Sequence, residues 1–232
     1  MKKGLIFIFA VVFFFSTTSS FSQKIYRATG GEFIFSFADV EENGINVPTN
    51  MRFTMFFHFT EKIHFDVTNN LGFYSGIGVR NVGFITDEDN YKIKRRSYML
   101  GVPLAIKLGS FKDNFYVYAG GEYELLFHYK QKLFVDGDKT KFSEWFSNRT
   151  NRFLPSFFAG VQFPKGINLQ FKYYLDDFLN RDFSGIDFGV PVSYATYKTQ
   201  IYYLSLSFNL RNKSFKNNTP DNAKEVNYAN NL

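Results

Sequence analysis

The sequence contains no cysteine and a single tryptophan among its 232 residues. The absence of cysteine excludes disulfide bonds, thiolate metal sites and a lipid anchor attached through a cysteine. Beyond the first residues, no stretch approaches the ~18 consecutive apolar residues that a membrane-spanning helix requires. If this chain crosses a membrane, it must therefore cross it with strands.

The first 23 residues have the pattern of a secretory signal. Lys2 and Lys3 form a short positive region, residues 4–15 are apolar, and residues 16–23 are small and polar. Such a segment is too short to span a bilayer and ends in a sequence typical of a cleavage site. We therefore predict a cleaved signal peptide over residues 1–22, followed by an exported chain.

Phenylalanine and tyrosine are abundant, and they fall on alternate positions. The chain contains 32 Phe and 15 Tyr, yet its mean hydropathy is only −0.21. Residues 167–176 illustrate the pattern, because the odd positions through Leu175 are apolar and most of the even positions are polar. A period of two residues indicates a strand with one apolar and one polar face. The pattern recurs about eight times, which predicts a β-barrel in lipid with a polar interior.

We predict an all-β fold: an eight-stranded, antiparallel, up-and-down transmembrane β-barrel over residues 23–210. Its connections alternate between long and short, and an even strand number places both termini in the periplasm. A turn at residues 60–62 separates the second and third strands, although a rival register that turns at Asn69-Asn70 stays open. Residues 211–232 are rich in Asn, Lys and Asp, which predicts a disordered periplasmic tail. The predicted strands cover Tyr26–Phe37, Thr49–Phe59, Ile63–Phe84, Arg96–Lys107, Phe115–Phe134, Arg152–Phe163, Ile167–Leu179 and Thr196–Leu210.

Three segments resemble a known group of proteins. They are Tyr98–Lys107, the glycine-spaced Leu71–Gly78 and Tyr116–Gly121, and they resemble the PorT-like outer-membrane β-barrel families. The resemblance covers roughly Tyr26–Leu210 and implies an outer-membrane barrel. The type member is an accessory of a protein secretion system, so the resemblance also offers a role in secretion or assembly.

Charged residues recur on the predicted inward positions. An eight-stranded barrel is just wide enough for its side chains to fill it, and charges in so dry a space must pair with one another. We therefore predict a structural charge network that plugs the lumen, while a narrow ion path or a small-ligand cavity stays an alternative. The predicted network comprises Glu32, Arg52, Asp66, Arg80, Lys107, Glu122, Glu124, Lys130, Lys172 and Asp176.

Candidate catalytic and metal-binding residues are few. The histidines are His58, His64 and His128, and outer-membrane lipid hydrolases pair His with Ser or Asp. No outward His-x-Ser pair is present near the external rim, so we interpret all three as interior structural residues, with His128 on an inward position. The acidic loops 87–89 and 136–138 lack the ligand spacing of a calcium site. We predict no enzymatic activity, no cofactor and no metal.

The predicted role follows from this architecture. We expect a monomeric, non-enzymatic outer-membrane protein with a structural or interaction role, which contacts lipid through its wall and possible envelope proteins through its loops or tail. The alternatives are an accessory of a secretion or assembly machine and, behind it, a lipid-modifying enzyme or a narrow pore. The formal charge of +6 is scattered along the strands of an exported chain, so nucleic acid is not an expected partner. Candidate interfacial aromatic residues are Tyr26, Phe84, Tyr98, Tyr129 and Tyr202.

Overall fold

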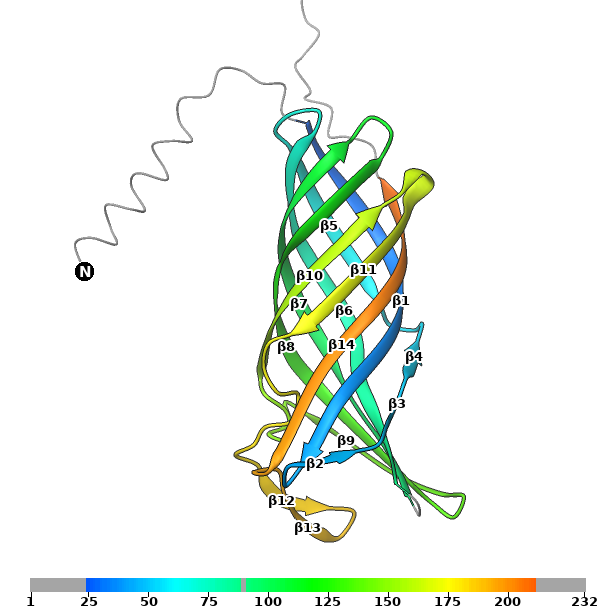
Figure 1. Cartoon of the computed structure of the whole chain (residues 1–232), viewed down its shortest axis with the longest axis vertical. Coiled ribbons are helices and arrows are strands. Elements are labelled where there is room, and N and C mark those ends of the chain that lie inside the picture. The colour runs from blue at the N-terminus through cyan, green and yellow to red at the C-terminus, as the bar shows by residue number, and fades with distance from the viewer. Residues whose placement is uncertain (1–23, 89–90, 212–232) are drawn as a thin grey trace, which may run out of the picture.

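The computed structural model describes residues 24–88 and 91–211 (Figure 1). The predicted signal peptide and residues 212–232 of the predicted tail lie outside this range, whereas Arg211, which we assigned to the tail, ends the last strand. The elements are β1 (Lys24–Glu42), β2 (Ile45–Val47), β3 (Thr49–Asn50), β4 (Arg52–Thr54), β5 (Phe59–Asp66), β6 (Leu71–Glu88), β7 (Tyr91–Ser110), β8 (Phe115–Val135), β9 (Asp138–Trp145), β10 (Phe153–Gln162), the 3-10 turn η1 (Pro164–Gly166), β11 (Ile167–Tyr174), β12 (Ser184–Asp187), β13 (Val190–Ser193) and β14 (Tyr197–Arg211).

Eight strands close into a ring in the order β1, β5, β6, β7, β8, β10, β11 and β14. Every neighbouring pair is antiparallel, and β14 closes the ring on β1 from Ala28 opposite Arg211 to Glu42 opposite Tyr197. A closed ring leaves no unpaired sheet edge. The predicted eight-stranded, antiparallel, up-and-down barrel is confirmed (Figure 1).

The turn after the second ring strand lies at residues 67–70, so the rival register is the observed one and the predicted turn at residues 60–62 is wrong. The Thr68 hydroxyl accepts hydrogen bonds from the backbone N–H groups of Asn70 and Leu71, at 3.1 and 2.9 Å. Such local bonds favour a tight turn. Residues 60–62 instead continue β5, where they pair with β1 on one side and β6 on the other.

The wall is irregular between β4 and β5. Residues 55–58 leave the ladder, and Phe57 has a φ of +63°. Side chains replace the missing backbone bonds: Arg52 donates to the carbonyl oxygen and to Oδ1 of Asn81, at 3.1 and 2.8 Å, and the Ser36 hydroxyl donates to the carbonyl oxygen of Gly83 at 2.8 Å. The strand that we predicted as continuous over residues 49–59 is therefore interrupted.

In β8, a β-bulge exchanges the inward and outward faces over the part of the strand that lies away from the chain termini. Tyr98 pairs with His128, but Met99 pairs with Leu126, which leaves Phe127 as an extra residue. An extra residue turns every later side chain to the opposite face. Tyr129 consequently points into the barrel and is 1% exposed, whereas His128 and Lys130 lie on the outer face. Our inward placement of His128 and Lys130 is wrong for this reason.

The end of the barrel away from the termini carries more strand than we predicted (Figure 1). β6 continues through Glu88, into the acidic loop that we predicted at residues 86–90, and β7 begins at Tyr91, before the predicted strand start at Arg96. Strand β9 forms within the predicted loop 136–151 and pairs with the outer part of β8. A separate hairpin, β12–β13, forms within the predicted loop 181–195. The turn that joins β8 to β9 is formed by Asp136-Gly137, where φ is +48° and +92°, values that a tight hairpin turn requires.

Pro103 occupies an inward position of β7, at a gap in the pairing of that strand with β6. Pairing of β6 with β7 stops after Ser75 opposite Leu104 and resumes at Gly78 opposite Gly101. Pairing with β6 is therefore interrupted without a bulge at the proline, which has no N–H to donate, whereas pairing with β8 continues through Pro103 opposite Glu122. The Ser75 hydroxyl donates to the Pro103 carbonyl oxygen at 2.8 Å and holds the two strands together there.

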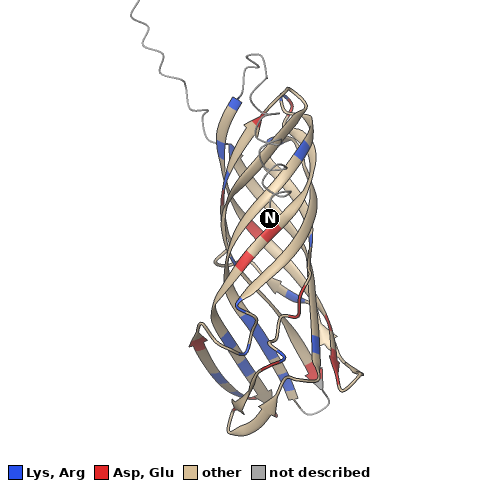
Figure 2. Cartoon of the chain, turned by 90° about the vertical axis from the view of Figure 1, so that its left-hand side faces the viewer, with Lys and Arg blue, Asp and Glu red and all other residues tan. Residues whose placement is uncertain are grey.

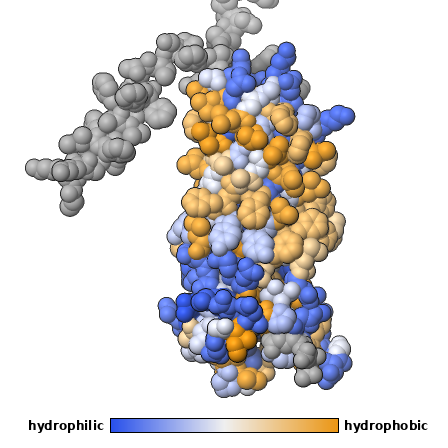
Figure 3. All heavy atoms as spheres, viewed as in Figure 1, coloured by the Kyte–Doolittle hydropathy of each residue, from blue (hydrophilic) through white to orange (hydrophobic). Residues whose placement is uncertain are grey.

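On the face shown in Figure 3, apolar side chains cover most of the wall over the half nearer the termini, and hydrophilic side chains gather toward the other end. No helix within the described ranges is long and apolar enough to span a membrane. The wall side chains that are both large and exposed include Phe33, Phe65, Ile77, Val102, Leu104, Ile106, Val117, Tyr123, Phe157, Leu169, Phe171, Leu204, Leu206 and Phe208, which together we call the apolar belt.

Candidate functional site

The lumen is packed in layers. An aromatic layer near the termini contains Tyr74, Tyr116, Tyr118 and Phe158. A larger apolar layer fills the opposite half and comprises Ile34, Ala38, Val40, Val82, Phe84, Met99, Leu126, Tyr129, Leu154, Tyr174, Phe178, Leu179, Tyr194, Ile201 and Tyr203. Along β6, β8 and β11, the buried charges fall between these two layers. The predicted polar, side-chain-filled interior therefore also holds a large apolar core.

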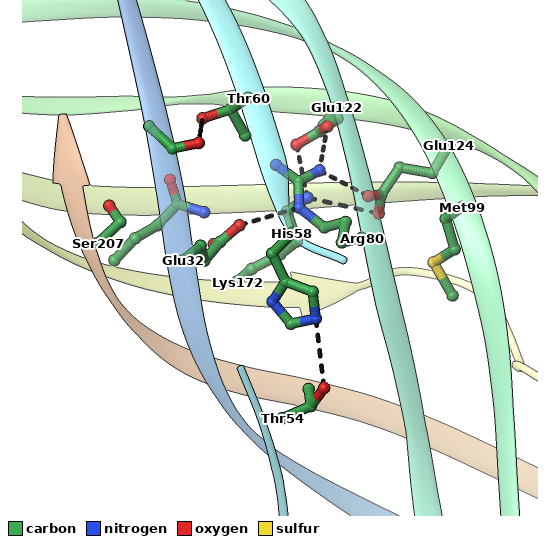
Figure 4. A network of polar contacts seen from close by, with 12 residues as sticks. Glu32, Thr54, His58, Thr60, Arg80, Met99, Glu122, Glu124, Lys172 and Ser207 are labelled. Carbon is green, nitrogen blue, oxygen red and sulfur yellow. Dashed lines mark hydrogen bonds and ion pairs between the residues drawn. The ribbon is translucent and has the colours of Figure 1, made fainter. Parts of the chain in front are cut away.

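Arg80 is the centre of the charged layer (Figure 4). Its Nε lies 3.3 Å from Glu32 Oε2, and its Nη1 lies 2.7 Å from Glu124 Oε1. The same Nη1 contacts Glu122. These bonds cross the lumen, since Arg80 comes from β6, Glu32 from β1 and the other two glutamates from β8.

Lys172 on β11 completes the layer. Its Nζ lies 2.5 Å from Glu122 Oε2 and 3.4 Å from Glu124 Oε2. The charged layer thus ties together four of the ring strands. Charge-assisted bonds of this kind are the strong class of hydrogen bond, and the five charged side chains are all buried: Glu32, Arg80, Glu122, Glu124 and Lys172.

Lys62 is a further lumen cation that we did not predict. Its Nζ lies 5.2 Å from the Tyr74 ring centroid, and it lines a cavity of about 10 Å³ together with Arg80 and Glu122. That volume holds about one water molecule. With Lys62, the three glutamates face three cations. The sequence did contain the signal, because the rival register that turns at residues 69–70 places Lys62 on an inward position.

A second ion pair lies nearer the termini. Lys107 Nζ is 2.5 Å from Asp66 Oδ1 and 2.9 Å from the Tyr26 hydroxyl. It also lies 4.2 Å from the Phe111 ring centroid, and Lys107 itself is fully buried. This pair joins β5 and β7 inside the ring, separately from the charged layer around Arg80.

Three residues that we predicted for the charge network take no part in these ion pairs. Arg52 is buried but bonds to Asn81 rather than to a carboxylate. Lys130 lies outside the barrel, 5.3 Å from the Tyr98 ring centroid, because of the bulge at Phe127. Asp176 is exposed, since β11 ends at Tyr174 and the chain leaves the wall there. Lys130 and Asp176 are therefore not part of the lumen.

The three histidines lie in different places. His64 stacks on Tyr26 at 4.7 Å inside the barrel, and His58 Nε2 lies 3.4 Å from the Thr54 hydroxyl. His128 stacks on Trp145 at 4.3 Å on the outer face. Within residues 24–88 and 91–211, no histidine ring bonds to a carboxylate, and no three His, Asp or Glu side chains converge as metal ligands.

Two further groups of predicted residues have defined positions. Among the interfacial aromatic candidates, Tyr26, Phe84 and Tyr129 are buried in the lumen; those three assignments are wrong, because the residues fall on inward positions of their strands. Asp87 pairs with Lys92 at 2.9 Å, and the hydrogen bond from Lys92 lowers the pKa of the Asp87 carboxyl.

An ion-pair cluster holds together the segments at the end of the barrel away from the termini. Arg149 Nε lies 2.8 Å from Asp187 Oδ1, and its Nη1 lies 2.6 Å from Glu144 Oε2. The Tyr194 hydroxyl donates to Asp187 Oδ2 at 2.6 Å. Burial raises the pKa of Tyr194 to about 12. The cluster connects β9 with the β12–β13 hairpin over the apolar layer of the lumen.

Comparisons with known proteins identify similar barrels at low identity. No family model and no curated protein matches the chain. Its structure is similar to that of Ail, the attachment invasion locus protein of Yersinia pestis, solved with the heparin analogue sucrose octasulfate: 13% identity, TM-score 0.36, covering 82% of this chain and all of that chain. It is also similar to Neisserial surface protein A, at 10% identity and TM-score 0.38 over 82% and 99% of the two chains. A third similar structure is outer membrane protein AlkL in lipid bilayers, at 16% identity and TM-score 0.39 over 84% and 95%. None of these singles out the PorT-like families, so that resemblance stays a prediction.

Proposed function

We propose that this chain is an integral outer-membrane β-barrel with a sealed lumen, no enzymatic activity and a structural or interaction role. The observation that carries the proposal is the inverted distribution of its side chains. Charges such as Arg80 and Lys172 are 3% and 0% exposed inside the ring, while Leu104 and Phe157 are 66% and 62% exposed outside it. A wall that is apolar outside and polar inside is suited to lipid rather than to water.

The shape of the barrel supports an outer-membrane orientation. Lys24 and Arg211 lie at one end of the ring, where the connections are the tight turns at residues 67–70, 111–114 and 163–166. The other end carries the long hairpins (Figure 1). Outer-membrane barrels have short periplasmic turns and longer external loops. This arrangement supports a periplasmic position for both termini of the barrel.

The packing of the lumen supports a sealed barrel rather than a pore. The charged layer around Arg80 lies between an aromatic and an apolar layer, and the cavity beside it has a volume of about 10 Å³. An ion would have to displace paired charges whose partners would then be buried alone, which is costly. The same pairing occupies the carboxylates that a lumen catalyst would need, which supports a non-enzymatic role.

The external hairpins support the interaction role. Ile186 and Val190 are 62% and 61% exposed on the β12–β13 hairpin, beyond the apolar belt. Exposed apolar side chains outside the membrane favour contact with another envelope protein. Affinity purification from solubilised membranes tests this role, including the alternative of an accessory in a secretion or assembly machine: a copurifying complex supports it, and a barrel isolated alone contradicts it.

Electrophoresis of membrane fractions without boiling tests the barrel itself. A folded outer-membrane barrel resists detergent and migrates differently before and after heating. We expect the protein to sediment with outer membranes and to show this heat-dependent shift. Recovery in the soluble fraction would refute the proposal.

A further inference from the structure

A surface of one charge sign covers part of the external wall. Lysine and arginine residues gather on neighbouring strands toward the end of the barrel away from the termini (Figure 2), and the strand register places six of them on the outer face of β7, β8 and β9. We call the following six residues the basic surface: Lys94 and Arg96 on β7, Lys130 and Lys132 on β8, and Lys139 and Lys141 on β9. Lys130 and Lys132 face outward only because of the bulge at Phe127, which is why the sequence pattern did not place them here.

Members of the basic surface lie directly opposite one another in the sheet. Lys132 is the cross-strand partner of Lys94 on one side and of Lys141 on the other, and Arg96 is the partner of Lys130. Like charges in directly opposite positions destabilise a sheet. Burial and the neighbouring cations, Arg96 foremost, lower the pKa of Lys132. The arrangement therefore costs stability unless an anion neutralises it.

No carboxylate supplies that anion within the described residues, since none of the six cations is in an ion pair there. Neighbouring Lys92 differs, because it pairs with Asp87 at 2.9 Å. The basic surface is also concave: Arg96, Lys132 and Lys141 line a hollow of about 330 Å³. It is thus an open, concave and unneutralised cationic site.

A row of aromatic rings separates the basic surface from the apolar belt. Tyr98 stacks on His128 at 5.6 Å, and His128 stacks on Trp145 at 4.3 Å. On β7, the residues beyond Tyr98 toward the termini are the apolar Leu100, Val102 and Leu104 on the same face. Aromatic rows of this kind lie at the boundary between the hydrocarbon and the headgroups.

The basic surface comes immediately after this row. Arg96 Cζ and Lys130 Nζ lie 5.9 and 5.3 Å from the Tyr98 ring centroid. In a barrel whose belt is in the bilayer, the cations are consequently at the level of the lipid headgroups, on the side wall rather than on the external tip. A lipid whose chains lie along Leu100 and Val102 has its headgroup on these cations. A soluble polyanion would contact the cations alone, whereas a lipid also uses the apolar wall that adjoins them.

We propose that the basic surface binds the phosphate groups of a phosphorylated glycolipid in the external leaflet. The proposal rests on the proposed function, because it requires the barrel to lie in the outer membrane. The phosphates neutralise the opposed cations on β7, β8 and β9, and the lipid chains cover the belt below them. The bound lipid thereby holds the β8–β9 hairpin upright on the wall.

The test measures lipid binding to the full-length mature protein in detergent by native mass spectrometry. The probes are bisphosphorylated lipid A, the same lipid A without phosphates, and a heparin-type sulfated oligosaccharide. The test variant K94Q/K132Q/K141Q removes the row of opposed lysines. The matched control K112Q/K165Q/K198Q removes three exposed lysines away from the basic surface.

We expect the test variant to bind bisphosphorylated lipid A about 100-fold more weakly than the wild type, because each lost cation removes one phosphate contact near the membrane surface. The control variant keeps wild-type affinity, and removal of the phosphates weakens binding to the wild type. Equal affinity of the test variant and the wild type overturns the proposal. Tighter binding of the sulfated oligosaccharide, competing with lipid A at the same residues, also overturns it in favour of a soluble polyanion. Heat-dependent mobility of each preparation reports separately on the barrel: its absence in the wild type refutes the proposed function, whereas its presence with no lipid A binding refutes this inference alone.

Discussion

Arg80→Met removes the cation at the centre of the charged layer and keeps a side chain of similar length. Glu32, Glu122 and Glu124 are 7%, 5% and 0% exposed, so water cannot replace the guanidinium. Of the ion pairs in this layer, only those of Lys172 with the two β8 glutamates survive. Glu32 loses its ion pair entirely.

The expected magnitude follows from the burial of these groups. Removal of one partner from a buried ion pair typically costs about 3–5 kcal/mol, because the remaining charge is left without compensation. A second substitution, Glu32→Gln, removes the carboxylate that R80M leaves without an ion pair and is expected to recover about 1–3 kcal/mol in the double variant. The matched control is Lys198→Met, whose pair with Glu41 is exposed and is worth at most ~1 kcal/mol.

Urea-dependent unfolding in detergent micelles measures these differences. Unboiled electrophoresis gives the folded fraction, and circular dichroism gives the loss of strand. We expect R80M to be much less stable than K198M, and we expect E32Q to rescue R80M in part. If R80M unfolds within about 1 kcal/mol of the wild type, the layer does not hold the barrel as described. If E32Q makes R80M less stable, uncompensated negative charge is not the cause.

Three further predictions follow. Gly101→Ala places a methyl group against the paired carboxylate of Glu122 and against Glu124, and is expected to cost about 1–3 kcal/mol in the same unfolding assay; a neutral result would contradict tight packing at this layer. Tyr194 has a pKa of about 12 when folded against about 10 when unfolded, so its contribution to stability is complete below pH 10 and is lost as the pH rises through 12. Tyr194→Phe should reduce the fall in the free energy of unfolding between these pH values. An unchanged fall would refute the titration of Tyr194 as its cause. Trp145 is stacked on His128, and its fluorescence should be quenched most by lipids brominated near the headgroup. Strongest quenching by lipids brominated at the chain end would show that the aromatic row lies deeper in the bilayer than we propose.

The sequence was sufficient to predict the barrel because alternation is a local signal. Each strand must present one face to lipid and one to the lumen. The odd or even position of a residue such as Leu204 or Lys172 therefore predicts which of the two its side chain faces. Closure into eight strands then follows from the number of alternating segments. Parity also identified the glutamates and the arginine of the charged layer, all of which the structure places in the lumen.

Our predictions were wrong where an extra residue reverses the alternation of inward and outward side chains and no local sequence pattern marks it. The bulge at Phe127 inverts His128, Tyr129 and Lys130, and nothing in the spacing of the chain marks an extra residue there. Such a bulge is determined by pairing with β7 and by the rings of Tyr98 and Trp145, which are distant in sequence. The basic surface was hidden for the same reason.

The turn between β5 and β6 was ambiguous for a different reason. Both Thr60-Glu61-Lys62 and Asn69-Asn70 are polar, so either could end a strand. The choice depends on hydrogen bonds of Thr68 and on the bond from Asn70 Nδ2 to the Gly109 carbonyl oxygen at 2.9 Å, which joins two adjacent turns. That contact exists only in the folded barrel, and its consequence is the inward position of Lys62.

Ion conductance in a planar bilayer tests the sealed transmembrane barrel most directly. The preparation is first shown to be inserted by its heat-dependent mobility, so that silence cannot result from unfolded protein. A lumen closed by the charged layer around Arg80, by the Lys107–Asp66 pair and by the apolar layers predicts no single-channel current above the bilayer baseline. Steady current steps from the inserted wild-type protein would contradict the account.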